Sequence, residues 1–330
     1  MGHIPVLLEP VLEALAPEDG EVHLDATFGG GGYARALLAA ADCVLLAIDR
    51  DPAAIARAED MAKTAPGMRP LLGRFGALDE LAIEAGHPAL DGVVLDLGVS
   101  SFQIDEAERG FSFQKDGPLD MRMAASGPSA ADILNQIDEA NLATLIFRLG
   151  EERASRRVAR AIVERRAQAP FSTTADLAEV VSDALGGRRG ARTHPATKVF
   201  QAVRIYVNDE LGELSRALLA AERILRPGGR LVLVTFHSLE DRAVKRFLRA
   251  RTGAESGPSR HMPGPAAASE PTFELISRKA IIPSDEERRA NPRARSAKLR
   301  AARRTAAAPR PADLEPAFNL PPLSQFAGRP

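Results

Sequence analysis

The sequence predicts an α/β fold in which a mainly parallel sheet carries helices on its faces and is interrupted by an inserted helical domain. Three observations lead to this prediction. A glycine run at residues 29–32 joins a strand-like segment to a helix-like one. Apolar runs then alternate with helical segments through the first third of the chain, as in βαβ units. This alternation gives way to mostly helical sequence and returns near residue 228.

The apolar runs of the first third are typical of parallel strands buried on both faces, because such strands need no polar alternation. The predicted strands are Val22–Phe28, Val44–Asp49, Arg69–Phe75 and Gly92–Leu97. Helical segments separate them. In one of these, Pro52–Lys63, the residues Ala54, Ile55 and Ala58 share a face that can pack on the sheet.

The stretch from 108 to 211 is predicted to be the inserted helical domain. Its helical segments, three of them with N-cap candidates (Ser129, Asp138 and Thr173), are Ser129–Asn135, Asp138–Leu149, Glu151–Gln168 and Thr174–Ala184. A long amphipathic helix at 209–225 then leads into strands at 228–238 and 273–282. The α/β domain would comprise residues 1–107 and 212–300, and a disordered tail would follow at 301–330.

Three carboxylates are predicted to lie along one rim of the sheet. Asp25, Asp49 and Asp96 each stand where a strand is expected to end. In an open α/β sheet the ligand crevice lies beyond the carboxyl ends of the strands. Asp49 also follows the glycine turn by about 20 residues, a separation that suits binding of a ribose diol. The pattern indicates a cofactor of the nucleotide type.

Two cofactors fit this pattern. Gly29, Gly31 and Ala34 match the dinucleotide motif, so an NAD-dependent oxidoreductase is one interpretation. A pyrophosphate, however, needs the helix N-terminus as an anion site, and Asp25 beside the glycines would repel it. S-adenosylmethionine carries a cationic sulfonium and an amino-acid end, which a carboxylate suits. The residues therefore favour S-adenosylmethionine.

Composition narrows the other possibilities. The 330 residues suggest about two domains, and 43 basic against 44 acidic side chains point to no particular partner. The single cysteine, Cys43, excludes an internal disulfide and fits a reducing cytoplasm. No signal peptide and no membrane-length apolar segment is apparent. The six histidines lack ligand spacing, so we expect no metal site.

Arginines cluster in two regions. Along one predicted helix they are Arg153, Arg156, Arg157, Arg160, Arg165 and Arg166, with Arg188, Arg189 and Arg192 farther on. From 288 to 310 the chain has many arginines, including Arg293, Arg295 and Arg300. Each region could be merely solvated or could bind phosphates of RNA. A non-catalytic RNA-binding module is thus a third interpretation of the chain.

The lone cysteine also bears on the reaction. Methylation at carbon 5 of a pyrimidine needs a thiolate nucleophile, and Cys43 lies at the start of a strand, away from the predicted crevice. Transfer to nitrogen needs only an aligned lone pair and acceptors for the amine hydrogens. Asp96 and the loop 98–101, with Ser100, stand where such acceptors belong. His237, after the strand at 228–238, is a further candidate at the crevice.

Several long motifs span the chain from His3 to about Arg300; they begin at His3, Asp25, Asp91, Glu108, Gly150, Phe200, Phe236 and Asn291. Together they resemble one family, the bacterial small-subunit ribosomal RNA cytosine-N4 methyltransferases of the RsmH/MraW type. The resemblance implies a Rossmann-like class I S-adenosylmethionine-dependent sheet. It also implies methylation of the exocyclic N4 of a cytidine in the decoding region of 16S rRNA, free or within the small ribosomal subunit.

The same resemblance implies the cofactor contacts. These fall on Gly31, Gly32, Tyr33, Asp49, Phe75, Asp96 and Gln103. Tyr33 stands where the family usually has histidine, so its contact is expected through the backbone. Phe102 replaces the usual proline before Gln103, which alters the stiffness expected of that loop. Asp96, Ser100 and His237 remain the candidates for catalysis, and the resemblance does not single out a base among them.

Overall fold

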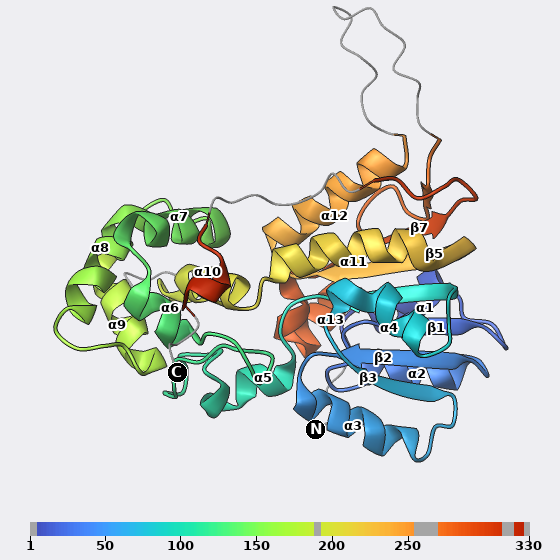
Figure 1. Ribbon diagram of the computed structural model, residues 1–330, viewed down its shortest axis with the longest axis horizontal. Helices are drawn as coiled ribbons and strands as arrows, with labels where there is room; N and C mark the ends of the chain where they lie inside the picture. Colours follow the sequence, from blue (N-terminus) through green and yellow to red (C-terminus); the bar gives the residue numbers. More distant parts are fainter. Residues whose placement is uncertain (1–4, 188–192, 254–269, 312–319, 327–330) are drawn as a thin grey trace, which may run out of the picture. The chain divides into compact units, whose positions relative to one another are not determined.

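The computed structural model describes residues 5–187, 193–253, 270–311 and 320–326. The chain divides into two compact units. The first comprises residues 1–98 and 211–315, and the second comprises residues 99–210 and 316–330. Each is described by itself below (Figure 1).

A seven-stranded sheet with the order β3-β2-β1-β4-β5-β7-β6 forms the centre of the first unit. Its strands are β1 (Val22–Asp25), β2 (Val44–Asp49), β3 (Met68–Leu72), β4 (Leu90–Asp96), β5 (Leu225–Thr235), β6 (Phe273–Leu275) and β7 (Lys298–Arg304). Strands β1 to β5 pair in parallel, whereas β7 is antiparallel to both of its neighbours. The α/β prediction is confirmed. The strand order turns back between β1 and β4, and in open α/β sheets ligands bind at such a point.

Helices cover both faces of this sheet (Figure 1). They are α1 (Leu8–Leu15), α2 (Gly32–Ala40), α3 (Pro52–Ala62), α4 (Leu78–Glu84), α11 (Glu210–Ile224), α12 (Ser238–Arg251) and α13 (Asp285–Ala290). Alternate strand residues enter different cores: Leu46 packs in the cluster that contains α4, α11 and α12, and Leu45 in the cluster that contains α1, α2 and α3. Burial on both faces explains the continuous apolar runs of the sequence.

The C-terminal part of the first unit differs from the sequence prediction. Of the expected strand at 273–282, Phe273–Leu275 forms β6 and Ile281 makes only an isolated antiparallel bridge to Leu299 of β7. The expected tail from 301 begins inside β7. Two of the three arginines of β7, Arg300 and Arg304, have partners within the fold. Arg300 pairs with Asp241 at 2.8 Å, and Arg304 donates to the carbonyl oxygens of Glu222 and Thr272. The partners of these arginines are distant in sequence. The composition of the segment alone therefore could not distinguish a buried strand from a solvated tail.

The second unit is helical in its described residues. Its helices are α5 (Ser101–Asp105), α6 (Ala130–Gln136), α7 (Glu139–Gly150), α8 (Ser155–Arg166), α9 (Thr174–Ala184) and α10 (Thr197–Val207). The side chains of Ser129, Asp138 and Thr173 cap α6, α7 and α9, as the sequence predicts. Residues 320–326 belong here too: Phe326 packs edge-on against Tyr206, whose hydroxyl donates to the carbonyl of Pro321.

No helix within the described ranges is long and apolar enough to cross a membrane.

Candidate functional site

The glycine turn follows β1 and leads into α2. Gly29 and Gly31 have φ angles of 52° and 71°, a region that side chains other than glycine rarely adopt. A Cβ at Gly31 would also lie 2.6 Å from atoms of Phe28 and Met61. A Cβ at Gly32 would collide with Pro5. Both the backbone conformation and the close packing of the turn therefore require glycine.

Asp25 and Asp96 lie at the ends of the two adjacent strands β1 and β4. Thr27 connects them, because its backbone N–H donates to Asp25 Oδ1 (3.1 Å) and its Oγ1 accepts the backbone N–H of Asp96 (2.6 Å). The other oxygen of Asp25, Oδ2, is buried and has no hydrogen-bond partner among the described residues. The same holds for Asp96 Oδ1. Two acceptors at the turning point of the sheet are thus left for a ligand.

The environment of these carboxyl groups changes their acidity. Burial raises the pKa of Asp25 to about 7, and the negative charge of Asp49 adds to the increase. Burial raises the pKa of Asp96 well above its usual range, with further contributions from the charges of Asp25 and Glu240. Such groups are stabilised by a cation or by hydrogen-bond donors, which would compensate for the lost hydration.

Asp49 holds the glycine turn from the end of β2. Its Oδ2 accepts the backbone N–H of Gly29 and its Oδ1 accepts that of Asp51, both at 2.9 Å. Its own carbonyl accepts the N–H of Gly73 (2.9 Å), which precedes the short helix Phe75–Ala77. Each carboxylate oxygen has a second lone pair, so Asp49 can still accept ribose hydroxyls. Half-buried Phe75 offers an apolar ring near the same strand ends.

The side chain of Tyr33 has a structural role. It is 3% exposed, lies in the core beside α1 and donates its hydroxyl hydrogen to the carbonyl of Val6. The ring therefore anchors the N-terminal segment. A contact with a cofactor is left to the backbone of this residue, which is the contact expected from the sequence.

Ser100 and Gln103 belong to the second unit. They form a capping box at the start of α5: Ser100 Oγ accepts the N–H of Gln103 (3.3 Å), and Gln103 Oε1 accepts the N–H of Ser100 (3.0 Å). Reciprocal bonds of this kind stabilise the first turn of a helix. Both side chains thus fix the junction between the loop after β4 and helix α5.

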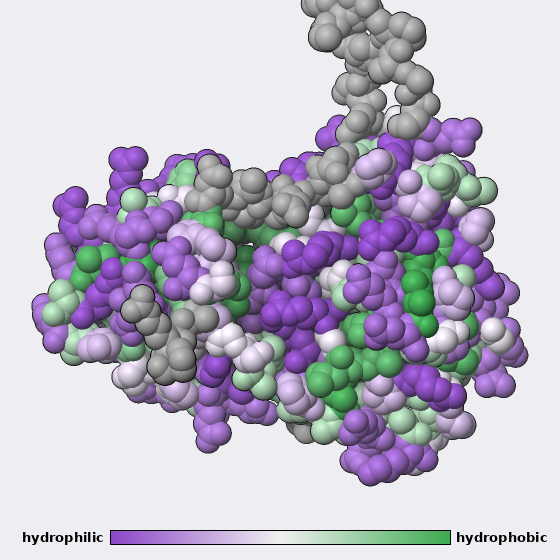
Figure 2. Space-filling model, in the orientation of Figure 1, coloured by the Kyte–Doolittle hydropathy of each residue, from purple (hydrophilic) through white to green (hydrophobic). Residues whose placement is uncertain are grey.

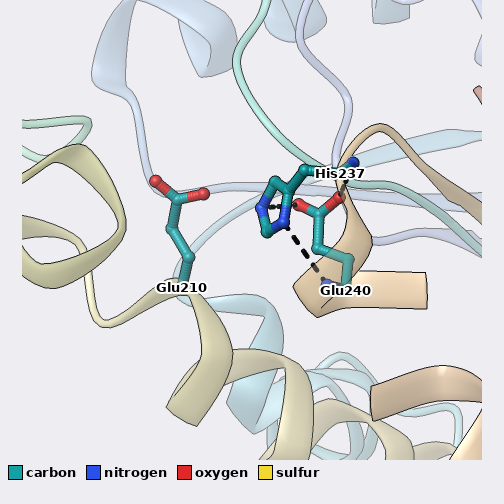
Figure 3. Close-up of side chains that lie close together, drawn as sticks. All are labelled: Glu210, His237 and Glu240. Atoms are coloured by element: carbon teal, nitrogen blue, oxygen red, sulfur yellow. Dashed lines mark hydrogen bonds and ion pairs between the residues drawn. The ribbon is translucent and has the colours of Figure 1, made fainter. Parts of the chain in front are cut away.

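His237 caps α12 in the first unit (Figure 3). Its Nδ1 accepts the backbone N–H of Glu240 (3.4 Å), and its Nε2 lies 3.1 Å from Glu240 Oε1. The carboxylate of Glu240 in turn accepts the N–H groups of Phe236 and His237. These contacts give His237 a part in holding the turn between β5 and α12, and a role in catalysis stays a prediction.

The arginines predicted to bind RNA do not behave alike. Arg300 is held by Asp241 in the sheet, Arg165 pairs with Asp176 at 2.8 Å, and Arg166 donates to the carbonyl of Leu134. These three guanidinium groups already have partners within the fold, and whether any of them also contacts RNA stays a prediction. Arg293 and Arg295 are exposed. The cluster of Arg188, Arg189 and Arg192 lies outside the described residues.

The donors and acceptors of the first unit fit S-adenosylmethionine. Unpartnered carboxylate oxygens suit the sulfonium and amino-acid end, Asp49 suits the ribose, and Phe75 suits the adenine ring. The residue that the sequence left unassigned here is Thr27, which connects two of the carboxylates. In the sequence, the only indication that Thr27 connects these carboxylates is its position two residues beyond the end of a strand.

Comparison with known proteins settles the family. The family model described as "MraW methylase family" matches residues 1–305. The chain belongs to the MraW methylase family. It is therefore a methyltransferase, and its cofactor is S-adenosylmethionine. The alternatives of an NAD-dependent oxidoreductase and of a non-catalytic RNA-binding module are excluded.

Curated relatives of this MraW-family chain are similar over nearly their whole length. The Ribosomal RNA small subunit methyltransferase H of Hyphomonas neptunium is 65% identical, over 98% of this chain and 95% of that protein. The protein of the same name from Paramagnetospirillum magneticum is 59% identical, over 92% and 96%. A solved rRNA methylase from Streptococcus thermophilus aligns with a TM-score of 0.40 at 10% identity, over 92% of this chain and 99% of that one, and adds nothing to the assignment.

Proposed function

We propose that this chain transfers the methyl group of S-adenosylmethionine to the exocyclic N4 of a cytidine in the decoding region of 16S rRNA. Relatives up to 65% identical are named as methyltransferases of the small ribosomal subunit RNA. The cytosine-N4 specificity comes from the resemblance of the motifs. The reaction would take place in the cytoplasm, where ribosomal RNA is modified in bacteria.

The observation that carries the proposal is the pair of buried, unpartnered oxygens on Asp25 and Asp96. In the proposed complex, Asp25 faces the cationic end of the cofactor and Asp49 binds its ribose. Phe75 packs on the adenine, and the backbone of the glycine turn, from Gly31 through Gly32 to Tyr33, approaches the cofactor closely. Gln103, in the first turn of α5, is proposed as a further cofactor contact on the strength of the motif resemblance.

Methyl transfer to an amine needs orientation and a place for one proton. When bound, S-adenosylmethionine supplies an electrophilic methyl group on its sulfonium sulfur. Transfer of this methyl group to the nitrogen breaks the bond between sulfur and carbon and leaves a neutral thioether. The lone pair of the cytosine amine is delocalised into the ring, so an acceptor for one of its N–H groups helps to expose it. Asp96 Oδ1 accepts that hydrogen and takes the proton that the nitrogen loses. Its raised pKa suits this uptake.

No nucleophile of the protein is needed for this transfer. Cys43 is buried immediately before β2, at the end of the strand opposite Asp49, and burial raises the pKa of its thiol. It is therefore held as a neutral thiol within the fold. Ser100 and His237, whose side chains cap α5 and α12, stay the further candidates for a part in catalysis.

The test is transfer of a labelled methyl group from S-adenosylmethionine to naked 16S rRNA and to isolated small subunits. We expect one labelled nucleoside after nuclease digestion, and mass spectrometry should place the methyl on N4 of cytidine. Comparison of the two substrates tells whether assembled subunits are needed. A methyl on carbon 5, or label in neither substrate, would refute the proposal.

A further inference from the structure

A groove runs between α7 and the N-terminal end of α8 in the second unit. Its volume is about 1110 Å³. The residues that line it are Glu139, Ala140, Ala143, Thr144, Phe147, Arg148, Arg153, Ala154, Ser155, Arg156, Arg157 and Arg160. Five of the twelve are arginines, against one carboxylate. Figure 2 shows that hydrophilic side chains dominate the visible surface of these helices.

The groove arginines are exposed and almost without partners. Among the described residues, no carboxylate or carbonyl binds the guanidinium groups of Arg148, Arg153, Arg156 and Arg157. Arg160 lies 3.9 Å from Glu139, and both side chains are largely exposed, so this pair is weak. Arginines at the other end of α8 are fully engaged within the fold. Within α8, the unpaired positive charge is thus concentrated at the end that lines the groove.

This charge opposes the stability of α8. The positive end of a helix dipole is at its N-terminus, where cations are unfavourable. The arginines that flank this end of α8, namely Arg153, Arg156 and Arg157, add positive charge there, and the N-cap Ala154 has no side-chain oxygen. Ser155 is only 5% exposed, lines the groove and makes no side-chain hydrogen bond with the described residues. An anionic ligand would satisfy all of these groups.

Phe147 gives the groove a flat apolar surface. The neighbouring α7 residues Leu145, Ile146 and Leu149 are buried in the unit, whereas Phe147 is 50% exposed. The guanidinium of Arg148 lies 5.8 Å from the centre of its ring. An exposed aromatic ring beside arginines is the arrangement on which proteins stack unpaired bases of RNA.

We propose that the α7/α8 groove binds a single-stranded or looped segment of the RNA substrate. The groove arginines contact its phosphates, and one unpaired base stacks on Phe147. An acidic peptide would match the charge but would leave the exposed ring without a planar partner, so RNA is the better fit. The inference rests on the proposed function only in taking RNA as the substrate.

Binding measurements with two RNA probes test this directly. One is a fluorescent hairpin with an unpaired loop, and the other is a fully paired duplex with the same number of phosphates. The triple variant Arg153→Gln, Arg156→Gln, Arg157→Gln should bind both probes more weakly. For the hairpin, the slope of log affinity against log salt should fall by about 0.7 for each lost contact.

Phe147→Ala should weaken hairpin binding about 5- to 150-fold, with an unchanged salt slope and little effect on the duplex. Phe147→Trp should restore hairpin binding. The matched control is the triple variant Lys245→Gln, Arg246→Gln, Arg249→Gln, which removes the same charge from the exposed face of α12. It should bind both probes nearly as the unaltered protein does.

Three results would overturn the inference. The groove variant could match the α12 control in affinity and salt slope, or Phe147→Ala could affect hairpin and duplex equally. The groove could also bind poly-glutamate in an arginine-dependent way while binding neither RNA. Failure of the proposed function is recognised separately: unaltered protein would then bind RNA through the groove and bind S-adenosylmethionine, yet transfer no methyl group to rRNA.

Discussion

Replacing Asp25 with asparagine is expected to stabilise the unliganded protein at neutral pH and to weaken cofactor binding. The side chain is 1% exposed, and its Oδ2 has no hydrogen-bond partner among the described residues. Asparagine keeps the shape of the group and can still accept the N–H of Thr27 through its carbonyl oxygen. It removes only the negative charge, so it separates the cost of that charge from the packing around it.

The magnitude follows from the pKa of Asp25, which rises from 3.8 to about 7 in the fold. Between these values the unfolded chain has released a proton that the folded chain keeps. The free energy of unfolding therefore falls by about 1.4 kcal/mol for each pH unit in this window. The total loss is about 4 kcal/mol, complete once the pH has risen through 7. The asparagine variant has no such loss.

Urea unfolding at several pH values between 5 and 8 measures the effect. The stability difference in favour of Asp25→Asn should grow with pH up to about 7 and then level off. Asp60→Asn is the control, because Asp60 is exposed beside Lys63 and should show no comparable pH trend in this window. Parallel stability curves for Asp25→Asn and the unaltered protein would refute the reasoning.

Cofactor binding should show the reciprocal behaviour. A cationic cofactor favours the ionised carboxylate, so affinity for S-adenosylmethionine should fall as the pH drops below about 7. The asparagine variant should bind more weakly and lose this part of the pH dependence. Titration calorimetry over the same pH range measures both effects. Equal affinity of the two proteins at pH 8 would place Asp25 outside the cofactor site.

Three further predictions concern the other rim carboxylates and a buried ion pair. Asp49→Ala should weaken S-adenosylmethionine binding about 10- to 100-fold, since a hydrogen bond to a charged group contributes about 1.5–3 kcal/mol; unchanged affinity in a folded variant would contradict its assignment. Asp96→Ala should lower turnover far more than it lowers cofactor affinity. Cys43→Ala should retain activity, because the transfer needs no nucleophile of the protein. An RNA adduct trapped on Cys43 would disprove direct transfer of the methyl group to nitrogen. Arg251→Met should destabilise the fold by about 3–5 kcal/mol in urea unfolding, because it leaves the buried carboxylate of Glu222, 2.9 Å away, without its charged partner. A double variant with Glu222→Met should lose less than Arg251→Met alone, and an equal loss would mean that the ion pair is not the cause.

The sequence alone determined the central part of this fold. Apolar runs within β2, β4 and β5 mark the buried parallel strands, and Gly29 and Gly31 in the turn report a local backbone requirement. The strand ends therefore located Asp25, Asp49 and Asp96 on one rim of the sheet before any tertiary contact was known. The caps of α6, α7 and α9 were predicted for the same reason, since a cap and its helix are neighbours in the chain.

Only the tertiary structure decided which charged side chains are available to a ligand. From the sequence, the arginine-rich segment at 288–310 is expected either to be solvated or to bind RNA phosphates, yet part of it is strand β7, with Arg300 paired to Asp241 from α12. On α8, Arg165 is bound by Asp176 from α9 and Arg166 by the carbonyl of Leu134 from α6, whereas the groove arginines stay exposed. The physical reason is that the state of a charged group depends on its burial and its nearest partners. Those partners come from segments distant in sequence, so composition and spacing cannot reveal them.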